Sequence, residues 1–203
     1  MQYMQNISDA STINYYNLNA RSYFASTVNA DMSDCYERFI RYLKPGDSII
    51  DVGAGSGRDA KYFLKCGFEV EGIDASAELC KLASDYTGVS IKCCTIQEWR
   101  PEKKYSGIWA NASLLHLNME EIEKFICMIP DILQDNGILY FSLKSGITTG
   151  MDTDGRFFTD VSEEKVQHLL GKSTAIKIVD MWKTEDKLNR NGFFWINVIA
   201  QKP

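Results

Sequence analysis

Apolar runs alternate with stretches of helical periodicity over most of this 203-residue chain. In the first run, Ile49, Ile50 and Val52 show no polar alternation, which is typical of a strand buried on both faces of a parallel sheet. Strands are predicted at 48–52, 69–73 and 89–94, from 107, and at 138–143, with helices between them at 58–65, 76–86 and 118–133. Because strands that alternate with helices are joined by crossovers, this pattern predicts a mostly parallel, doubly wound sheet.

Local signals mark where several helices begin and end. Residues 11–43 repeat apolar side chains at helical spacing and predict two or three helices, which Pro45-Gly46 ends. Asn118 and Glu121 have the spacing of a capping box, in which each side chain bonds the backbone of the other residue. Pro130 is expected to kink the last turns of the helix that starts there.

The last sixty residues depart from the alternation. A loop rich in Gly, Thr and Asp at 144–160 precedes a short helix at 162–170, and strands are then predicted at 175–181 and 193–200. The polar segment between these two strands is too short for a crossover helix, so they must pair antiparallel. The predicted fold is α/β: a Rossmann-like sheet of seven strands, mostly parallel with an antiparallel last strand, plus N-terminal helices.

Composition narrows the class of protein. Apolar residues make up 45% and charged residues 24% of the chain, which is ordinary for one soluble globular domain. The net charge of −5 argues against broad nucleic-acid binding, which needs a surplus of Lys and Arg. No apolar run approaches the roughly 20 residues that span a bilayer, and the N-terminus lacks the features of a signal peptide. A cytoplasmic protein without membrane or nucleic-acid partners is expected.

The six cysteines predict no metal site. They form no C-x-x-C pair and have no histidine at a ligand spacing. Buried thiols in a reducing cytoplasm are the better interpretation.

The glycines at 53, 55 and 57 follow the first strand, and Asp51 lies within it. Glycine-rich turns of this kind let a backbone approach a bound nucleotide. The spacing is neither the G-x-G-x-x-G of dinucleotide folds nor a P-loop, so a pyrophosphate is not supported. Asp74 ends the second strand, where a carboxylate can accept both hydroxyls of a ribose. A ribose without a pyrophosphate fits S-adenosylmethionine, whose tail carries an ammonium and a carboxylate.

At these residues the chain resembles the class I S-adenosylmethionine-dependent methyltransferases. Asp51-Val-Gly-Ala-Gly-Ser-Gly57 resembles their first motif and Gly72-Ile-Asp74 their second, and the resemblance extends over about residues 11–203. Within that family the chain is most similar to small methyltransferases of the tellurite-resistance type or of uncharacterised small-molecule type. This likeness is carried by Gly55-Ser-Gly-Arg-Asp59, Trp109-Ala-Asn-Ala-Ser-Leu-Leu-His116, Leu143-Lys-Ser-Gly146 and Gly155-Arg-Phe-Phe158.

The resemblance implies one methyltransferase domain over 1–203. Residues 1–45 would form a helical lid, 46–143 the cofactor-binding core, and 144–203 a substrate loop and a closing antiparallel hairpin. The reaction implied is in-line transfer of a methyl group to a small-molecule acceptor, which leaves S-adenosyl-L-homocysteine as the product. No metal is expected.

The resemblance also implies roles for individual residues. Asp51 would face the ammonium of the cofactor, directly or through water, or it caps a helix. Asp74 would bind the ribose, or it caps the helix that starts near Ser76. Arg58 would meet the carboxylate of the methionine tail, or it is a solvated surface residue. The expected cofactor residues are Tyr23, Asp51, Gly53, Ala54, Gly55, Arg58, Asp74, Ala75, Ser76, Ile96, Gln97, Ala110, Asn111 and Ala112.

Several polar and aromatic side chains are candidates for the lid and the reacting end of the site. His116 is the candidate acid–base group, because an ordinary histidine titrates near neutrality; packing under the adenine or capping a loop is the alternative. Methyl transfer also works without a base when the acceptor is aligned. Lys144 and Arg156 could bind an anionic or chalcogen-containing acceptor, or be solvated. Tyr15, Tyr16 and Tyr23 could form the lid or belong to the core.

Motifs of other methyltransferase classes are absent. The position of the [DN]-P-P-[YF] motif of amino-methylating enzymes reads Asn111-Ala-Ser-Leu, and the Pro-Cys pair used in cytosine methylation does not occur. Two rival functions stay open. One is a module that binds S-adenosylmethionine without catalysis, and the other is a nicotinamide-dependent oxidoreductase, against which the glycine spacing argues.

Overall fold

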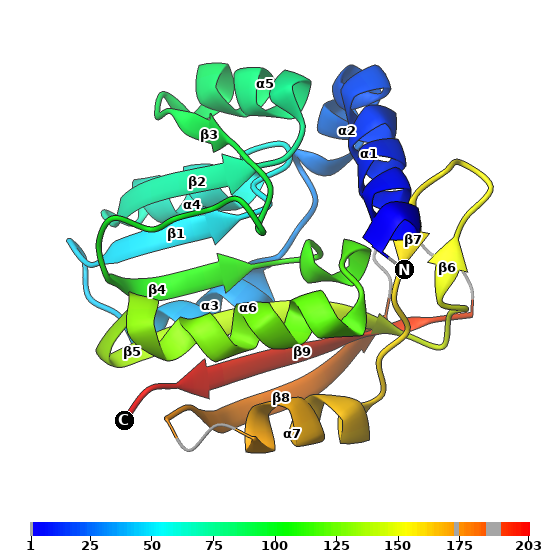
Figure 1. Ribbon diagram of the computed structural model, residues 1–203. Coiled ribbons are helices and arrows are strands. Elements are labelled where there is room, and N and C mark those ends of the chain that lie inside the picture. The colour runs from blue at the N-terminus through cyan, green and yellow to red at the C-terminus, as the bar shows by residue number, and fades with distance from the viewer. Residues whose placement is uncertain (1, 173–174, 186–191) are drawn as a thin grey trace.

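The structure, a computed structural model, describes the backbone of residues 2–172, 175–185 and 192–203, and the side chains from residue 9 onwards. Within these ranges, a sheet of seven strands has the order β3-β2-β1-β4-β5-β9-β8, as Figure 1 shows. Strands β1 to β5 are parallel, and β9 runs antiparallel to both β5 and β8. The predicted fold class is therefore confirmed. The strands are β1 (Ser48–Val52), β2 (Glu69–Asp74), β3 (Ile91–Cys93), β4 (Tyr105–Ala110), β5 (Leu133–Ser145), β8 (Lys177–Glu185) and β9 (Phe194–Gln201).

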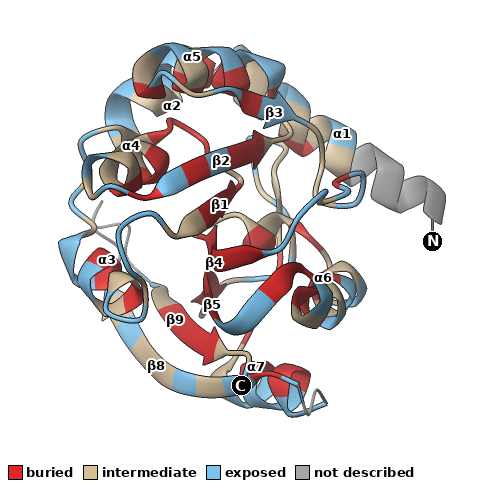
Figure 2. Ribbon diagram, turned by 90° about the vertical axis from the view of Figure 1, so that its left-hand side faces the viewer, coloured by how far each residue is buried: buried red, intermediate tan, exposed pale blue. Residues whose placement is uncertain are grey.

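Helices cover both faces of the sheet (Figure 2). Helices α3 (Ser33–Ile40) and α4 (Arg58–Lys65) pack on one face, where Phe39, Phe63 and Trp109 belong to one buried cluster. Helices α6 (Met119–Ile132) and α7 (Glu163–Gly171) pack on the other, in a larger cluster that contains Phe125 and Phe141. Helix α5 (Ala77–Thr87) packs beside β3. The central strands β1 and β4 are thus buried on both faces, as their apolar sequences predict, whereas the edge strand β8 is partly exposed.

The N-terminal helices lie at the carboxyl ends of the parallel strands (Figure 1). Helix α1 (Gln2–Leu18) is tied to α5 by Asn17, whose Oδ1 accepts a hydrogen bond of 2.8 Å from the Ser76 hydroxyl. It is tied to the small hairpin of β6 (Gly150–Met151) and β7 (Phe157–Phe158) by Thr12, whose hydroxyl accepts a 2.9 Å bond from the Phe157 amide. Helix α2 (Ala20–Thr27) follows at once. These bonds hold α1 over the edge of the sheet where a ligand is expected.

Most element boundaries follow local signals, and several do not. The capping box at the start of α6 is confirmed, with bonds of 3.0 Å in both directions between Asn118 and Glu121. Helix α1 begins nine residues before the predicted helical region, and the loop predicted at 144–160 contains the β6–β7 hairpin. Strand β5 begins five residues before the predicted 138, and its register with β4 shifts through a bulge in which Asn136 is left-handed at φ 64°. Strand β3 begins two residues later than predicted, and β8 spans 177–185 where the sequence predicts 175–181. Residues 186–191, part of the polar segment predicted between the last two strands, lie outside the described residues.

The cysteines occupy both buried and exposed positions. Cys35 and Cys80 are buried, whereas Cys93 and Cys127 are exposed, so the expectation of buried thiols is wrong for the latter two. In the described part of the chain no three or more His, Cys, Asp or Glu side chains are grouped so that they could hold a metal ion. Among the described helices none combines the length and the apolar character needed to cross a bilayer.

Candidate active site

Two adjoining cavities lie at the carboxyl ends of β1, β2 and β4, against α1 and α2. The smaller cavity measures about 120 Å³ and the larger about 740 Å³. Ligands of open α/β sheets bind at this edge. Six residues line both cavities and mark their junction: Tyr16, Tyr23, Gly53, Gly55, Ala112 and His116.

The structure brings thirteen of the fifteen predicted site residues to these cavities. Asp74, Ala75, Ser76, Ile96 and Gln97 line the smaller one, and Ala54, Arg58 and Asn111 line the larger. Tyr23, Gly53, Gly55, Ala112 and His116 line both. Asp51 and Ala110 line neither, because both are buried at the ends of their strands. The predicted residues therefore form one continuous site, with Asp51 and Ala110 behind its wall.

The glycine loop between β1 and α4 closely contacts two other segments. Gly53 is left-handed at φ 78°, and a Cβ atom there would lie 2.4 Å from the Cβ of Ser113. A Cβ atom on Gly55, at φ 54°, would lie 3.3 Å from Cε1 of Tyr23. Only glycine fits both the conformation and the space at Gly53. The loop can therefore pass directly under α2 and against the residues that follow β4.

Asp74 supports the loop and lines the smaller cavity. One carboxylate oxygen accepts a 2.8 Å hydrogen bond from the Gly55 amide, and the other a 2.8 Å bond from the Ser76 amide. The Ala75 amide also donates to this carboxylate, and because a carboxylate offers about four acceptor positions, the remaining capacity is available to a ribose. The alternative role of helix cap belongs to Ser76, whose hydroxyl accepts from the Leu79 amide. Burial raises the pKa of Asp74 above its ordinary value, although these backbone amides favour the charged form.

Asp51 is buried behind the glycine loop, with 1% of its surface exposed. The amide of Ala60, in the first turn of α4, donates to this carboxylate, so the helix-capping alternative has a structural basis. The other oxygen, Oδ2, has no hydrogen-bond partner among the described residues. Burial raises the pKa of Asp51 well above its ordinary value, and the nearby Asp59 carboxylate raises it further. A buried carboxylate oxygen in this state attracts a cation or a proton.

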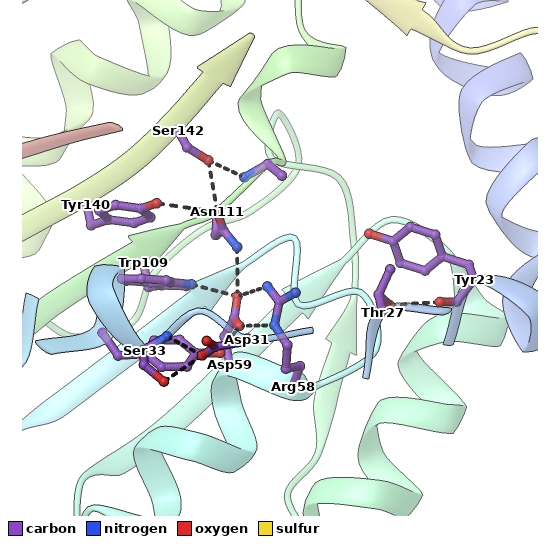
Figure 3. A network of polar contacts seen from close by, with 12 residues as sticks. Tyr23, Thr27, Asp31, Ser33, Arg58, Asp59, Trp109, Asn111, Tyr140 and Ser142 are labelled. Atoms are coloured by element: carbon purple, nitrogen blue, oxygen red, sulfur yellow. Dashed lines mark hydrogen bonds and ion pairs between the residues drawn. The ribbon is translucent and has the colours of Figure 1, made fainter. Parts of the chain in front are cut away.

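Arg58 is not the solvated surface residue of the alternative interpretation, because its side chain is only 18% exposed. Its guanidinium binds Asp59 through Nε at 2.6 Å and Nη2 at 3.0 Å (Figure 3). The Asp59 carboxylate also accepts hydrogen bonds from the side chains of Tyr36, Trp109 and Asn111. Asp59 is not predicted as a site residue from the sequence, since apart from the adjacent Arg58 its partners come from α3 and from the end of β4 and the residue after it.

Asn111 and Ala112 follow β4 at the junction of the cavities. Asn111 accepts a 2.9 Å bond from the Ser142 hydroxyl, which itself accepts a 2.8 Å bond from the Ala112 amide (Figure 3). Ala112 is left-handed at φ 52°, an uncommon conformation for a residue other than glycine. Hydrogen bonds from β5 therefore hold this turn in place.

Both ring nitrogens of His116 have hydrogen-bond partners. Its Nδ1 lies 2.7 Å from the carbonyl oxygen of Phe157, and its Nε2 lies 2.8 Å from the Tyr16 hydroxyl. A carbonyl only accepts, so Nδ1 carries the proton and Nε2 accepts from Tyr16. Burial lowers the pKa of His116 to about 4, and Arg156 and Lys144 lower it too, against the bond to Phe157. The imidazole is therefore neutral near pH 7, and in this arrangement a proton can reach Nε2 only through Tyr16.

Two cations face aromatic rings at the far end of the larger cavity. The Lys144 ammonium lies 4.4 Å from the centroid of the Phe158 ring, and this residue is only 8% exposed. The Arg156 guanidinium lies 4.4 Å from the centroid of the Tyr15 ring and forms a 2.8 Å ion pair with Asp152. Neither side chain is a solvated surface cation.

The tyrosines of α1 and α2 contact one another edge to face. The ring centroids of Tyr15 and Tyr16 are 5.4 Å apart, and those of Tyr16 and Tyr23 are 5.1 Å apart. All three rings line the larger cavity, and Tyr16 and Tyr23 also line the smaller one. At the opposite end of the site, the Gln97 side chain donates to Glu121 at 2.8 Å.

A family model described as methyltransferase domain matches residues 24–170 of the chain. A ubiquinone biosynthesis O-methyltransferase of Rhodopseudomonas palustris is 27% identical over 46% of this chain and 38% of that protein. An uncharacterised protein of Methanocaldococcus jannaschii is 28% identical over 64% of this chain and 50% of that protein. The chain thus spans half or less of the length of these curated relatives.

Solved structures share the fold at low sequence identity. A Burkholderia thailandensis 1,6-didemethyltoxoflavin-N1-methyltransferase, with bound 1,6-didemethyltoxoflavin and S-adenosylhomocysteine, has a TM-score of 0.73 and 21% identity over 97% of this chain and 90% of that one. A magnesium protoporphyrin IX methyltransferase from Synechocystis, with bound S-adenosylhomocysteine, has a TM-score of 0.69 and 16% identity over 94% of this chain and 97% of that one. The [4+2]-cyclase SpnF has a TM-score of 0.70 and 17% identity over 98% of this chain and 96% of that one. At these identities the likeness concerns the fold.

Proposed function

Because the chain belongs to the methyltransferase domain family, we propose that it is an S-adenosylmethionine-dependent methyltransferase acting on a small-molecule acceptor. The observation that carries this proposal is the pair of adjoining cavities. Asp74 lines the smaller cavity, and the larger has about 740 Å³ for the methionine end and an acceptor. The methyltransferases of similar fold that hold S-adenosylhomocysteine support the same cofactor here.

The residues present fit this cofactor. Asp74 has unused acceptor capacity for ribose hydroxyls, and the unpartnered Oδ2 of Asp51 suits a nearby ammonium. Arg58 would bind the carboxylate, while Ala75, Ser76, Ile96 and Gln97 would surround the adenine. Bound S-adenosylmethionine supplies a methyl group on an electrophilic sulfonium.

We place the acceptor in the larger cavity, with Lys144 and Arg156 at its far end. Because carboxylates of Asp152 and Asp154 already pair with Arg156, it is mainly the Lys144 ammonium that favours an acceptor with negative charge. His116 stays the acid–base candidate, and the acceptor proton would reach its Nε2 through Tyr16. A base with a pKa of about 4 accepts a proton only weakly near pH 7. Most of the rate acceleration is therefore expected from alignment of the acceptor and exclusion of water.

A second candidate function keeps the cofactor and drops the methyl transfer. The similar fold of a [4+2]-cyclase favours this alternative, since the same architecture serves a different reaction there. The alternative predicts binding of S-adenosylhomocysteine without transfer of a methyl group to any acceptor.

Two measurements test the proposal. Isothermal calorimetry with S-adenosylhomocysteine and, separately, NAD should give heat for the former alone; binding of NAD alone would favour an oxidoreductase. Methyl-labelled S-adenosylmethionine should then label a member of a panel of thiols, phenols, amines and oxyanions. Micromolar cofactor binding with no labelled product across the panel would favour the non-catalytic candidate.

A further inference from the structure

Asp59 is a buried carboxylate that lines the larger cavity but has most of its partners in the protein core. We propose that Asp59 is a positioning residue, which fixes the Arg58 guanidinium as a receptor for the carboxylate of an amino-acid-bearing nucleoside and holds Asn111 beside it. The proposal rests on the proposed function, because the ligand that carries this carboxylate is the cofactor.

The Asp59 carboxylate binds donors from four other residues. Arg58 donates twice, through Nε and Nη2, and Trp109 donates through Nε1 at 2.8 Å. Asn111 donates through Nδ2 at 3.2 Å, and the Tyr36 hydroxyl also donates to it. These donors come from α3, α4 and the end of β4, so the carboxylate joins three elements at one point (Figure 3). Little acceptor capacity remains for a ligand, and Asp59 therefore acts through its neighbours.

Charge explains why this carboxylate stays ionised in a buried place. Its side chain is 9% exposed, and that of Arg58 is 18% exposed. Burial by itself raises the pKa of Asp59, but the charge of Arg58 and the hydrogen bonds outweigh it and hold the pKa below its ordinary value. A guanidinium has five N–H donors in a rigid fork, of which the bridge to Asp59 uses two. The fork thus keeps donors for an oxyanion in the larger cavity, which Arg58 lines.

The same carboxylate also reaches the turn after β4. Asn111 bonds Asp59 through its amide nitrogen, so its oxygen is directed to the Ser142 hydroxyl, which holds the left-handed Ala112. Ala112 lies at the junction of the two cavities. Without Asp59, Arg58 would lose its fixed orientation and Asn111 its anchor, although both could stay in place as residues of ordered elements.

A double-mutant cycle tests the link through Arg58. Asp59→Asn, Arg58→Met and the double variant are titrated calorimetrically with S-adenosylhomocysteine and with 5′-methylthioadenosine, which lacks the amino acid. Each single variant should bind S-adenosylhomocysteine about 10-fold or more weakly, and the double variant no more weakly than Arg58→Met, since interacting groups are not additive. Affinity for 5′-methylthioadenosine should stay within about twofold, because its contacts are in the smaller cavity.

Asp47→Asn is the matched control, since the Asp47 carboxylate likewise accepts a hydrogen bond, here from the backbone amide of Lys44, but lies in a turn before β1 and outside both cavities. It should leave both affinities unchanged. If Asp59→Asn does not fold, Arg58→Lys replaces it: the charge is kept, the bidentate bridge is lost, and affinity for S-adenosylhomocysteine alone should fall. Additive losses in the cycle, or equal losses for both ligands, would overturn the positioning role. Failure of the wild-type protein to bind S-adenosylhomocysteine would instead contradict the proposed function.

Discussion

The two histidines provide a test of the site's electrostatics, because one is half-buried and hydrogen-bonded at the cavities and the other is exposed. His116 is bonded to Tyr16 and Phe157, whereas His168 is exposed on α7. Burial lowers the pKa of His116 from 6.5 to about 4 in the folded chain. Folding therefore favours the neutral ring. The contribution of His116 to the stability of the folded state is complete above pH 6.5 and is lost as the pH falls from 6.5 toward 4.

The size of the effect follows from this shift. The difference between the two pKa values corresponds to a maximum contribution of about 3.4 kcal/mol to the free energy of unfolding. About 2.5 kcal/mol of this contribution is lost between pH 7.5 and 4.5. His116→Gln removes the titrating group and leaves the carboxylates that also titrate in this range. The advantage of the wild-type protein over His116→Gln in free energy of unfolding should therefore shrink by about 2.5 kcal/mol between these pH values.

Urea unfolding followed by circular dichroism at both pH values measures this difference. His168→Gln is the control, and its free energy of unfolding should follow that of the wild-type protein within about 0.5 kcal/mol at both pH values. A constant difference between wild type and His116→Gln would refute the assignment of His116 as a neutral imidazole, and with it the bond from Tyr16 to Nε2.

Two further predictions concern the glycine loop and the start of α6. Gly53→Ala should lower the free energy of unfolding in urea by about 2–4 kcal/mol, because the left-handed backbone is strained and the added Cβ overlaps Ser113. The control is Gly88→Ala, at φ 84° with open space around it, which should lower it by only about 1–2 kcal/mol. Equal losses for the two variants would show that Gly53 is not crowded. Asn118→Ala should lower the free energy of unfolding by about 1 kcal/mol through loss of the cap, while Glu121→Gln, which keeps an acceptor, should lower it less; the reverse order would contradict the capping box.

The fold could be predicted from the sequence where the signals are local. The strand Ser48–Val52 and the helix Arg58–Lys65 have the predicted bounds, because an apolar run, a glycine turn and Gly67 mark them in the chain itself. No local signal predicts the β6–β7 hairpin or the early start of α1. These segments are held by contacts across the chain, such as the bond between Thr12 and Phe157, which no sequence window contains.

The site residues likewise fall into those that a local motif predicts and those that depend on contacts across the chain. The motif residues Gly53, Gly55 and Asp74 could be identified because their positions at the ends of two predicted strands indicate a tight turn and a carboxylate beside it. Asp59 and the bond from Tyr16 to His116 could not, since each depends on side chains that meet only in the folded chain. Arg58 was identified without its ion partner, although that partner is the next residue.

The central claim is that the cavity beside Asp74 binds the ribose of S-adenosylmethionine. Its most direct test is calorimetric titration of S-adenosylhomocysteine into the wild-type protein, Asp74→Ala and Asp85→Ala, an exposed acid on α5. Loss of two charge-assisted hydrogen bonds should cost about 2–4 kcal/mol, a roughly 30- to 900-fold rise in Kd for Asp74→Ala. Asp85→Ala should bind like the wild-type protein. An unchanged Kd in a folded Asp74→Ala variant would contradict the ribose site and leave the cofactor assignment without its main support.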